Sequence, residues 1–167
     1  MTLRLILTRH AKSSWSDPMM DDHERPLNNR GRASAQAVGA WLAARGYVPD
    51  EALVSSATRT RETWELIAGA FDAAPAAVIR PDLYNAEPEG MLAALREATG
   101  RVVMIVAHNP GAAYFAQGIV EVPPPDARFG RYPTAATTVI DFEFSDWGGV
   151  VWRSGRIVDL VFARDLI

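Results

Sequence analysis

Short apolar runs alternate with stretches of helical periodicity along the first two thirds of the chain. The apolar runs predict buried strands at 3–7, 52–54, 77–79 and 101–107. Apolar residues recur at helical spacing over 31–45, 58–71, 87–99 and 110–118. Gly46 and Gly100 are natural ends for the first and third of these helices. Strands that alternate with helices at this spacing indicate a mainly parallel sheet covered on both faces.

The last third of the chain has a different pattern. A loop is predicted over 122–133, and two strand-like runs follow at 137–144 and 155–162 without a helix between them. Neighbouring strands joined by a short polar segment are typical of antiparallel pairing. We therefore predict an α/β fold with three layers, a mostly parallel central sheet and an antiparallel edge. A chain of 167 residues with no internal repeat is predicted to form a single domain over 1–167.

The composition argues against several classes of protein, namely membrane-spanning, disulfide-bonded and nucleic-acid-binding proteins. The chain is 49% hydrophobic, and its longest plain apolar stretch, 102–107, is far shorter than the roughly 20 residues of a membrane-spanning helix. The chain contains no cysteine and no signal-peptide pattern, so we expect a cytoplasmic protein without disulfides or thiolate chemistry. The formal net charge of −3 gives no general attraction to nucleic acid or to a membrane, and we expect neither as a partner. Any bound anion must be held by a local group of cations.

The candidate catalytic residues lie where the predicted parallel strands end. His10 follows the first strand directly after Arg9, Arg59 follows the second, and His108 follows the fourth. Ligands of open parallel sheets bind beyond the carboxyl ends of the strands, so these four side chains are expected to meet there. Two of the three histidines occupy such ends. Arginine presents paired donors to phosphate oxygens, and the predicted cluster therefore suits a phosphoryl group.

Several blocks in chain order resemble the histidine phosphatase (phosphoglycerate mutase-like) superfamily. The segment from Leu7 to Ser13 is similar to its Arg-His-Gly signature, with Ala11 in place of the usual glycine. This variant, followed by Trp15, resembles the SixA-type phosphohistidine phosphatase branch. The further matching blocks are 25–31, 55–63, 83–86, 106–111 and 132–135.

The resemblance implies a role for each matching residue. His10 would be the nucleophile that forms a phosphohistidine intermediate, and Arg9, Arg59 and His108 would hold the phosphoryl oxygens. Lys12, Ser13 and Asn109 are candidate substrate contacts, although Lys12 and Ser13 are equally compatible with ordinary surface positions. No metal or other cofactor is expected, because the arginines and histidine would supply the positive charge. The substrate would be a phosphorylated protein or a small phosphorylated molecule.

The sequence also departs from the family pattern. Ser56 stands in place of a proline, Glu62 in place of a glutamine, and Ser16 where many relatives carry an asparagine. Relatives that act on phosphate esters carry an acid after the third strand, where this chain has Asn85; Glu87 is a possible substitute. The inserted cap of the mutases is also absent. The missing acid bears on the choice of substrate. An alkoxide leaving group needs a general acid, whereas imidazole, with a conjugate-acid pKa of roughly 6.5, is a far better leaving group.

Three functions remain open at this point. The favoured one is a phosphohistidine phosphatase that acts on a phosphoprotein through His10 without a metal. The second is a phosphatase for small phosphate esters or nucleotide-like substrates, and the third is a non-catalytic phosphate-binding module. We expect no part in binding or catalysis for the remaining conspicuous residues. His23 and Arg61 are expected to be exposed, and Trp15 and Trp41 are expected to pack against other residues.

Overall fold

The apolar runs form one six-stranded sheet in the computed structural model, which describes all residues 1–167. The strands lie in the order β3-β2-β4-β1-β5-β6. Their bounds are β1 Thr2–Arg9, β2 Glu51–Ser55, β3 Ala77–Arg80, β4 Val102–Ala107, β5 Thr137–Glu143 and β6 Arg156–Val161. The first four strands pair in parallel, whereas β5 pairs antiparallel with both β1 and β6. The predicted mostly parallel sheet with an antiparallel edge is confirmed.

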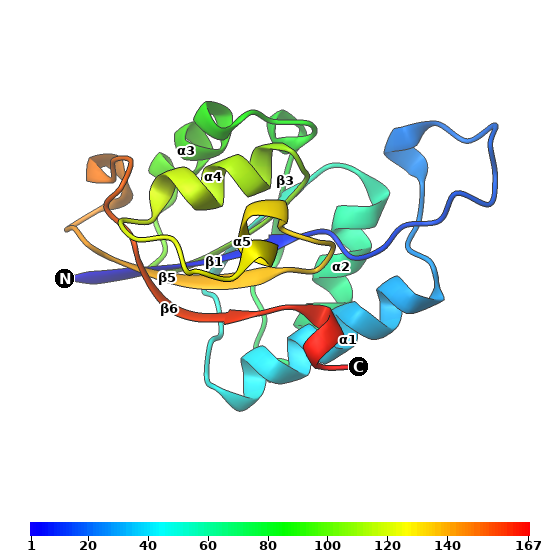
Figure 1. Ribbon diagram of the computed structural model, residues 1–167, viewed down its shortest axis with the longest axis horizontal. Coiled ribbons are helices and arrows are strands. Elements are labelled where there is room, and N and C mark those ends of the chain that lie inside the picture. The colour runs from blue at the N-terminus through cyan, green and yellow to red at the C-terminus, as the bar shows by residue number, and fades with distance from the viewer.

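Helices cover both faces of the sheet, which confirms the predicted three-layer arrangement (Figure 1). One face carries α1 (Asn29–Ala44) and α2 (Thr58–Ala68). The other carries α3 (Pro88–Arg96), α4 (Gly111–Ile119) and the short α5 (Ala127–Arg131). None of these helices combines the length and the apolar character that a membrane-spanning segment needs.

Two apolar cores lie between the layers, and β1 serves both. Leu3, Leu5 and Leu7 point into the core beneath α3 and α4, whereas Ile6 points into the core beneath α1 and α2. Successive side chains of a strand alternate between the faces of a sheet, so a strand covered on both sides must be apolar throughout. This explains the apolar residues on both faces of β1; Arg4 is the exception, since it is partly exposed and pairs with Asp141 at 2.7 Å.

The structure corrects several predicted boundaries. The helix predicted to reach residue 71 ends at Ala68, and the helix predicted to reach residue 99 ends at Arg96. The predicted loop over 122–133 contains α5, which begins where the Asp126 carboxylate accepts a hydrogen bond from the Arg128 amide at 2.9 Å. Five residues are too few to show helical periodicity, so the pattern of apolar residues gave no sign of this helix.

Candidate active site

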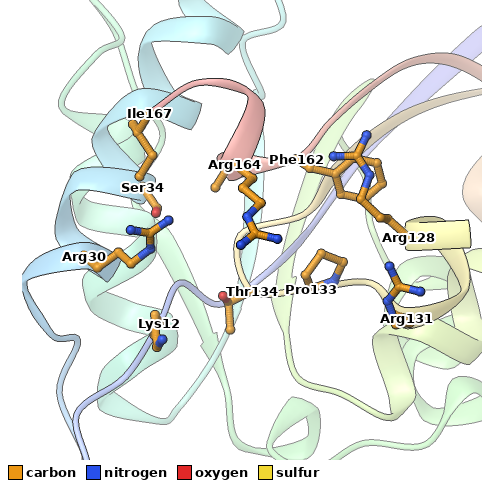
Figure 2. A pocket seen from close by; sticks show the side chains of 11 residues that line it. Lys12, Arg30, Ser34, Arg128, Arg131, Pro133, Thr134, Phe162, Arg164 and Ile167 are labelled. Carbon is orange, nitrogen blue, oxygen red and sulfur yellow. The ribbon is translucent and has the colours of Figure 1, made fainter. Parts of the chain in front are cut away.

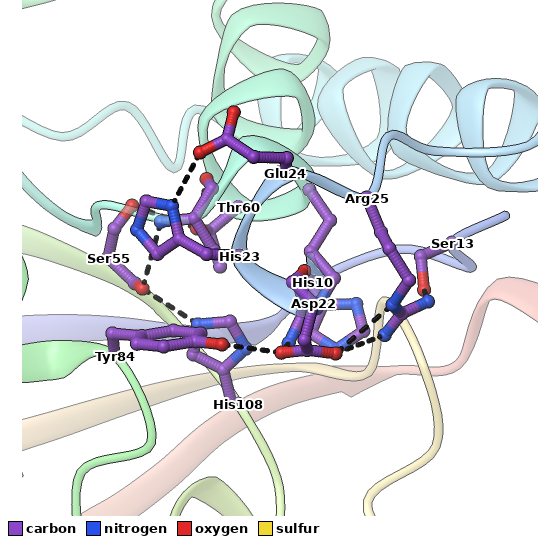
Figure 3. A network of polar contacts seen from close by, with 12 residues as sticks. His10, Ser13, Asp22, His23, Glu24, Arg25, Ser55, Thr60, Tyr84 and His108 are labelled. Atoms are coloured by element: carbon purple, nitrogen blue, oxygen red, sulfur yellow. Dashed lines mark hydrogen bonds and ion pairs between the residues drawn. The ribbon is translucent and has the colours of Figure 1, made fainter. Parts of the chain in front are cut away.

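The two strand-end histidines lie side by side at the carboxyl edge of the sheet. β1 and β4 are neighbours, and Arg9 is in register with Ala107, so the residue after each strand emerges at the same level. The His10 amide donates a hydrogen bond to the Ala107 carbonyl at 3.0 Å. The ring centroids of His10 and His108 are 5.3 Å apart (Figure 3). The predicted meeting of these two side chains is confirmed.

His10 is held with one ring nitrogen fixed. Its Nδ1 lies 2.7 Å from the Ala11 carbonyl oxygen, which can only accept, so Nδ1 carries the hydrogen and Nε2 keeps its lone pair. The residue is 7% exposed. Burial, together with the charges of Arg9 and Arg59, lowers the pKa of His10 to about 3. The imidazole is therefore neutral at physiological pH, as a nucleophile must be.

His108 is also neutral and is oriented by a serine. Its Nε2 forms a 2.7 Å hydrogen bond with the Ser55 hydroxyl, which follows from the parallel pairing of β2 with β4. Burial, then the neighbouring His10 and the charge of Arg59, lower the pKa of His108 to about 3. Its Nδ1 is buried and has no hydrogen-bond partner within the protein. A buried polar atom without a partner is costly, so this nitrogen is suited to a polar ligand.

Three arginines surround the histidine pair. Arg9 ends β1, and its Nη1 donates to the Tyr132 carbonyl at 3.2 Å. Arg59 lies in the first turn of α2 and is only 4% exposed. Arg25 is 6% exposed and donates to the Ser13 hydroxyl at 2.7 Å. Sequence reasoning gave no role to Arg25, although it opens one of the matching blocks.

Asp22 and Tyr84 are further site residues that the sequence did not reveal. The Asp22 carboxylate accepts from the Tyr84 hydroxyl at 2.6 Å and forms an ion pair with Arg25 at 3.0 Å (Figure 3). It also accepts from Arg59 Nη2 at 3.0 Å. The hydrogen bond from Tyr84 and those from Arg25 and Arg59 hold the pKa of Asp22 well below its usual range. This carboxylate is thus an anion among the cations of the site, and at neutral pH it carries no proton to donate.

The segment after His10 is fixed by contacts from α1 and α2. The Ala11 amide donates to the Thr63 hydroxyl at 3.0 Å. Glu62 accepts from the Leu27 amide at 2.8 Å through one carboxylate oxygen, a bond that the amide oxygen of a glutamine also forms. Gly31 lies so close to Lys12 that a β-carbon would clash with the Lys12 carbonyl oxygen. Glu62 therefore keeps the hydrogen bond to Leu27 that a glutamine would make. Residue 31 must be glycine, because any side chain would clash with Lys12.

A pocket of about 310 Å³ opens over the histidines. It is lined by Arg9, His10, Lys12, Ser13, Trp15, Arg25, Arg59, His108, Asn109 and Thr134. All seven site residues proposed from the sequence are among them. The Asn109 amide, however, already donates to the carbonyls of Arg131 and Tyr132 at 2.9 and 3.0 Å, which gives it a structural task.

Neither Asn85 nor Glu87 lines this pocket, and both side chains are exposed. Ser16 lies outside the lining as well. No carboxylate is among the lining residues. The structure has no group of three or more histidine, cysteine or acidic residues arranged to hold a metal ion.

Two expectations for conspicuous residues are wrong. Trp15 is 76% exposed rather than packed, and the Arg25 guanidinium lies 3.5 Å from its ring centroid. His23 is only partly exposed; its Nε2 forms a 2.9 Å hydrogen bond with the Ser56 hydroxyl, and its ring contacts Tyr84 edge-on at 4.8 Å. Both errors concern the loop between β1 and α1, whose course no periodicity predicts. Trp41 packs against the core beneath α1, as expected.

Comparisons with known proteins agree with this geometry. The model of the histidine phosphatase superfamily (branch 1) matches residues 5–87. An uncharacterized protein of Mycobacterium tuberculosis is 32% identical over 139 residues, which cover 79% of this chain and 85% of that protein. An uncharacterized chloroplastic protein of Arabidopsis thaliana is 53% identical over 60 residues, and this match spans 28% of that protein. A crystal structure named for the phosphohistidine phosphatase SixA of Agrobacterium tumefaciens has a TM-score of 0.77 and 28% identity, covering 96% of this chain and 97% of that one.

Proposed function

The chain belongs to the histidine phosphatase superfamily and is a phosphatase, and from this premise we propose that its substrate is a phosphohistidine on a protein. One observation carries the proposal. The pocket over His10 is lined by histidine, arginine and lysine and by no carboxylate, so it holds a phosphoryl group well but has no evident proton donor for a leaving alkoxide.

The proposed reaction has two steps. In the first, the Nε2 lone pair of His10 attacks phosphorus in line, and a new P–N bond forms as the P–N bond of the substrate breaks. The imidazole of the substrate, protonated on its other ring nitrogen, takes the electron pair of the broken bond and leaves as neutral imidazole. Arg9, Arg59 and His108 stabilise the charge on the equatorial phosphoryl oxygens. The Ala11 carbonyl keeps the hydrogen on Nδ1, so that the attacking nitrogen is always Nε2.

In the second step, water attacks the phosphohistidine formed on His10. The P–Nε2 bond breaks, its electron pair returns to the imidazole, and both water protons leave with inorganic phosphate. The fixed positive charge near phosphorus comes from arginine, so we propose that neither step needs a metal. Removing a general acid typically costs roughly 10²–10⁴-fold in rate for a poor leaving group. An imidazole leaving group is largely spared this loss, which supports a P–N substrate.

The two alternatives have less support. A phosphatase for small esters or nucleotide-like molecules needs a proton donor, yet Glu87 is outside the pocket lining and Asp22 is held ionised. A non-catalytic binding module would have no need for a buried neutral imidazole with one free nitrogen. His10 has that form.

The test is a side-by-side measurement of kcat/KM on a phosphohistidine protein and on a panel of alkyl phosphates. We expect kcat/KM on the P–N substrate to exceed that on alkyl phosphates by several orders of magnitude. Comparable values on both substrate classes would overturn the phosphohistidine proposal in favour of an ester phosphatase. No turnover of any phosphorylated substrate would favour the binding module.

A further inference from the structure

A second basic cavity lies beside the catalytic pocket. It measures about 290 Å³, and Lys12 and Thr134 line both it and the pocket over His10. Its other charged lining residues are Arg30 from α1, Arg128 and Arg131 from α5, and Arg164 from the segment after β6 (Figure 2). No aspartate or glutamate is among the lining residues. We name this feature the basic cavity.

Most of the positive charge in the basic cavity is unbalanced. Arg128 forms ion pairs with Asp126 at 2.8 Å and Asp165 at 3.1 Å. The side chains of the other four cations form neither an ion pair nor a hydrogen bond within the protein: Lys12, Arg30, Arg131 and Arg164. Lys12 is the single lysine of a chain whose net charge is −3. Four unpaired cations around one opening of an acidic protein form a local positive field that attracts anions.

The form of the basic cavity indicates which anion it suits. In the catalytic pocket, Arg25 and Arg59 are 6% and 4% exposed, as befits cations that converge on one phosphoryl group. The four unpaired cations of the basic cavity are all exposed and come from four separate parts of the fold. Cations spread around an open rim match several carboxylates on a surface better than a single small ligand.

We infer that the basic cavity binds acidic side chains that flank the phosphohistidine of the protein substrate. This inference rests on the proposed function and adds the substrate class that it favours: phosphoproteins with an acidic surface next to the modified histidine. The shared Lys12 places these carboxylates next to the phosphoryl site. Rim charges of this kind raise the rate of encounter and select the partner, and they leave the chemical step unchanged.

Two phosphohistidine peptides that differ only in flanking glutamate or glutamine test the inference. The variants are Arg30→Gln, Arg131→Gln, Arg164→Gln and their combination, and Arg101→Gln at the other end of β4 is the matched control for loss of one charge. We expect the wild type to show a KM about tenfold lower for the glutamate peptide, in keeping with a few modest rim contacts. The triple variant should lose this preference with kcat unchanged. Arg101→Gln should keep it.

Phosphoramidate, which has no flanking groups, and inorganic pyrophosphate complete the experiment. The triple variant should hydrolyse phosphoramidate with an unchanged KM. Equal use of both peptides by the wild type, or an equal rise in KM for all substrates, would overturn the inference. A larger loss of pyrophosphate inhibition than of peptide preference would overturn it in favour of a small polyanion.

Failure of the proposed function has a separate signature. If neither peptide is turned over while p-nitrophenyl phosphate is hydrolysed, the phosphohistidine proposal is wrong. The acidic peptide without its phosphoryl group then serves as a competitive inhibitor of p-nitrophenyl phosphate hydrolysis. Weaker inhibition of the triple variant than of Arg101→Gln would still support the basic cavity, and equal inhibition would overturn it.

Discussion

The Asp22 carboxylate pairs with the Arg59 guanidinium at 3.0 Å, and the same arginine donates to the Asp22 carbonyl at 2.7 Å. A cation expected to hold the phosphoryl group is thus in contact with an acid of the protein itself. A substrate that binds these two Nη donors competes with Asp22 for Arg59, whose Nε has no partner within the protein. We therefore expect Asp22 to set part of the affinity of the site for anions.

Asp22→Asn should strengthen anion binding. Exposed ion pairs contribute about 0.2–1 kcal/mol, and the Asp22 side chain is partly exposed, so we expect the inhibition constant of inorganic phosphate to fall about two- to fivefold. Asp82→Asn, which removes the partner of Arg80 away from the pocket, is the matched control and should leave this constant unchanged. A rise in the constant for Asp22→Asn would mean that the carboxylate orients the arginines rather than competing for them.

His10→Ala should abolish turnover while the protein remains folded. His108 also has a nitrogen without a partner, but that atom is the buried Nδ1, whereas the unpaired Nε2 of His10 is not among the buried atoms. Acid-labile label from a phosphorylated substrate should be trapped on the wild type and not on the variant. Thermal unfolding checks that the variant is folded. Undiminished hydrolysis by His10→Ala would refute the assignment of the nucleophile.

The missing acid after β3 can be restored. Asn85 has a φ of 57°, a left-handed conformation that asparagine and aspartate tolerate better than other residues, so Asn85→Asp should be made alongside Asn85→Glu. Either acid should raise kcat/KM on alkyl phosphates, by up to roughly 10²-fold if it reaches the leaving oxygen, and change P–N cleavage little. Glu87→Gln is the matched control and should be nearly silent on both substrates. Loss of efficient ester hydrolysis in Glu87→Gln would instead identify Glu87 as the acid.

Acidification should destabilise the protein through His10 and His108. Their pKa values are about 3 when folded, below the ordinary 6.5 that they regain on unfolding, so the unfolded state binds more protons below pH 6.5. The stability that they contribute is complete above pH 6.5 and is lost as the pH falls. The free energy of unfolding should drop towards pH 5 with a slope approaching about 1.4 kcal/mol per pH unit for each histidine. Urea titrations at several pH values should show a smaller slope for His10→Asn and for His108→Asn, and an unchanged slope would contradict neutral burial.

Activity should survive chelation. The proposed mechanism places arginine where other phosphatases use a metal ion, so incubation with EDTA should leave kcat and KM unchanged. Phosphate release after dialysis against the chelator is the measurement. Loss of activity that one particular divalent ion restores would show that a metal takes part.

The sequence predicted the parts of the site that regular strands position. His10 and His108 were expected to meet because they follow apolar runs, and parallel strands bring their carboxyl ends to one edge. Asp22, Arg25 and Tyr84 were missed for a physical reason. The first two lie on the 13–25 loop, whose course depends on contacts such as Arg25 with Ser13, and Tyr84 follows the edge strand β3. Contacts between distant polar side chains leave no periodic trace in a sequence.

The position of β1 in the sheet has a consequence for motion. β1 lies between β4 and β5, so its backbone is hydrogen-bonded along both edges, whereas the 13–25 loop contains one turn of 3-10 helix and one isolated bridge, from Ser13 to Leu27. Interior strands open at a cost close to that of global unfolding, and exposed loops open far more cheaply. His10 and His108, at the ends of central strands, are therefore expected to stay fixed. Asp22 and Arg25 belong to the loop, which can move while the strands remain in place. A site of this kind would admit a bulky partner through motion of the loop while His10, the proposed nucleophile, stays in place.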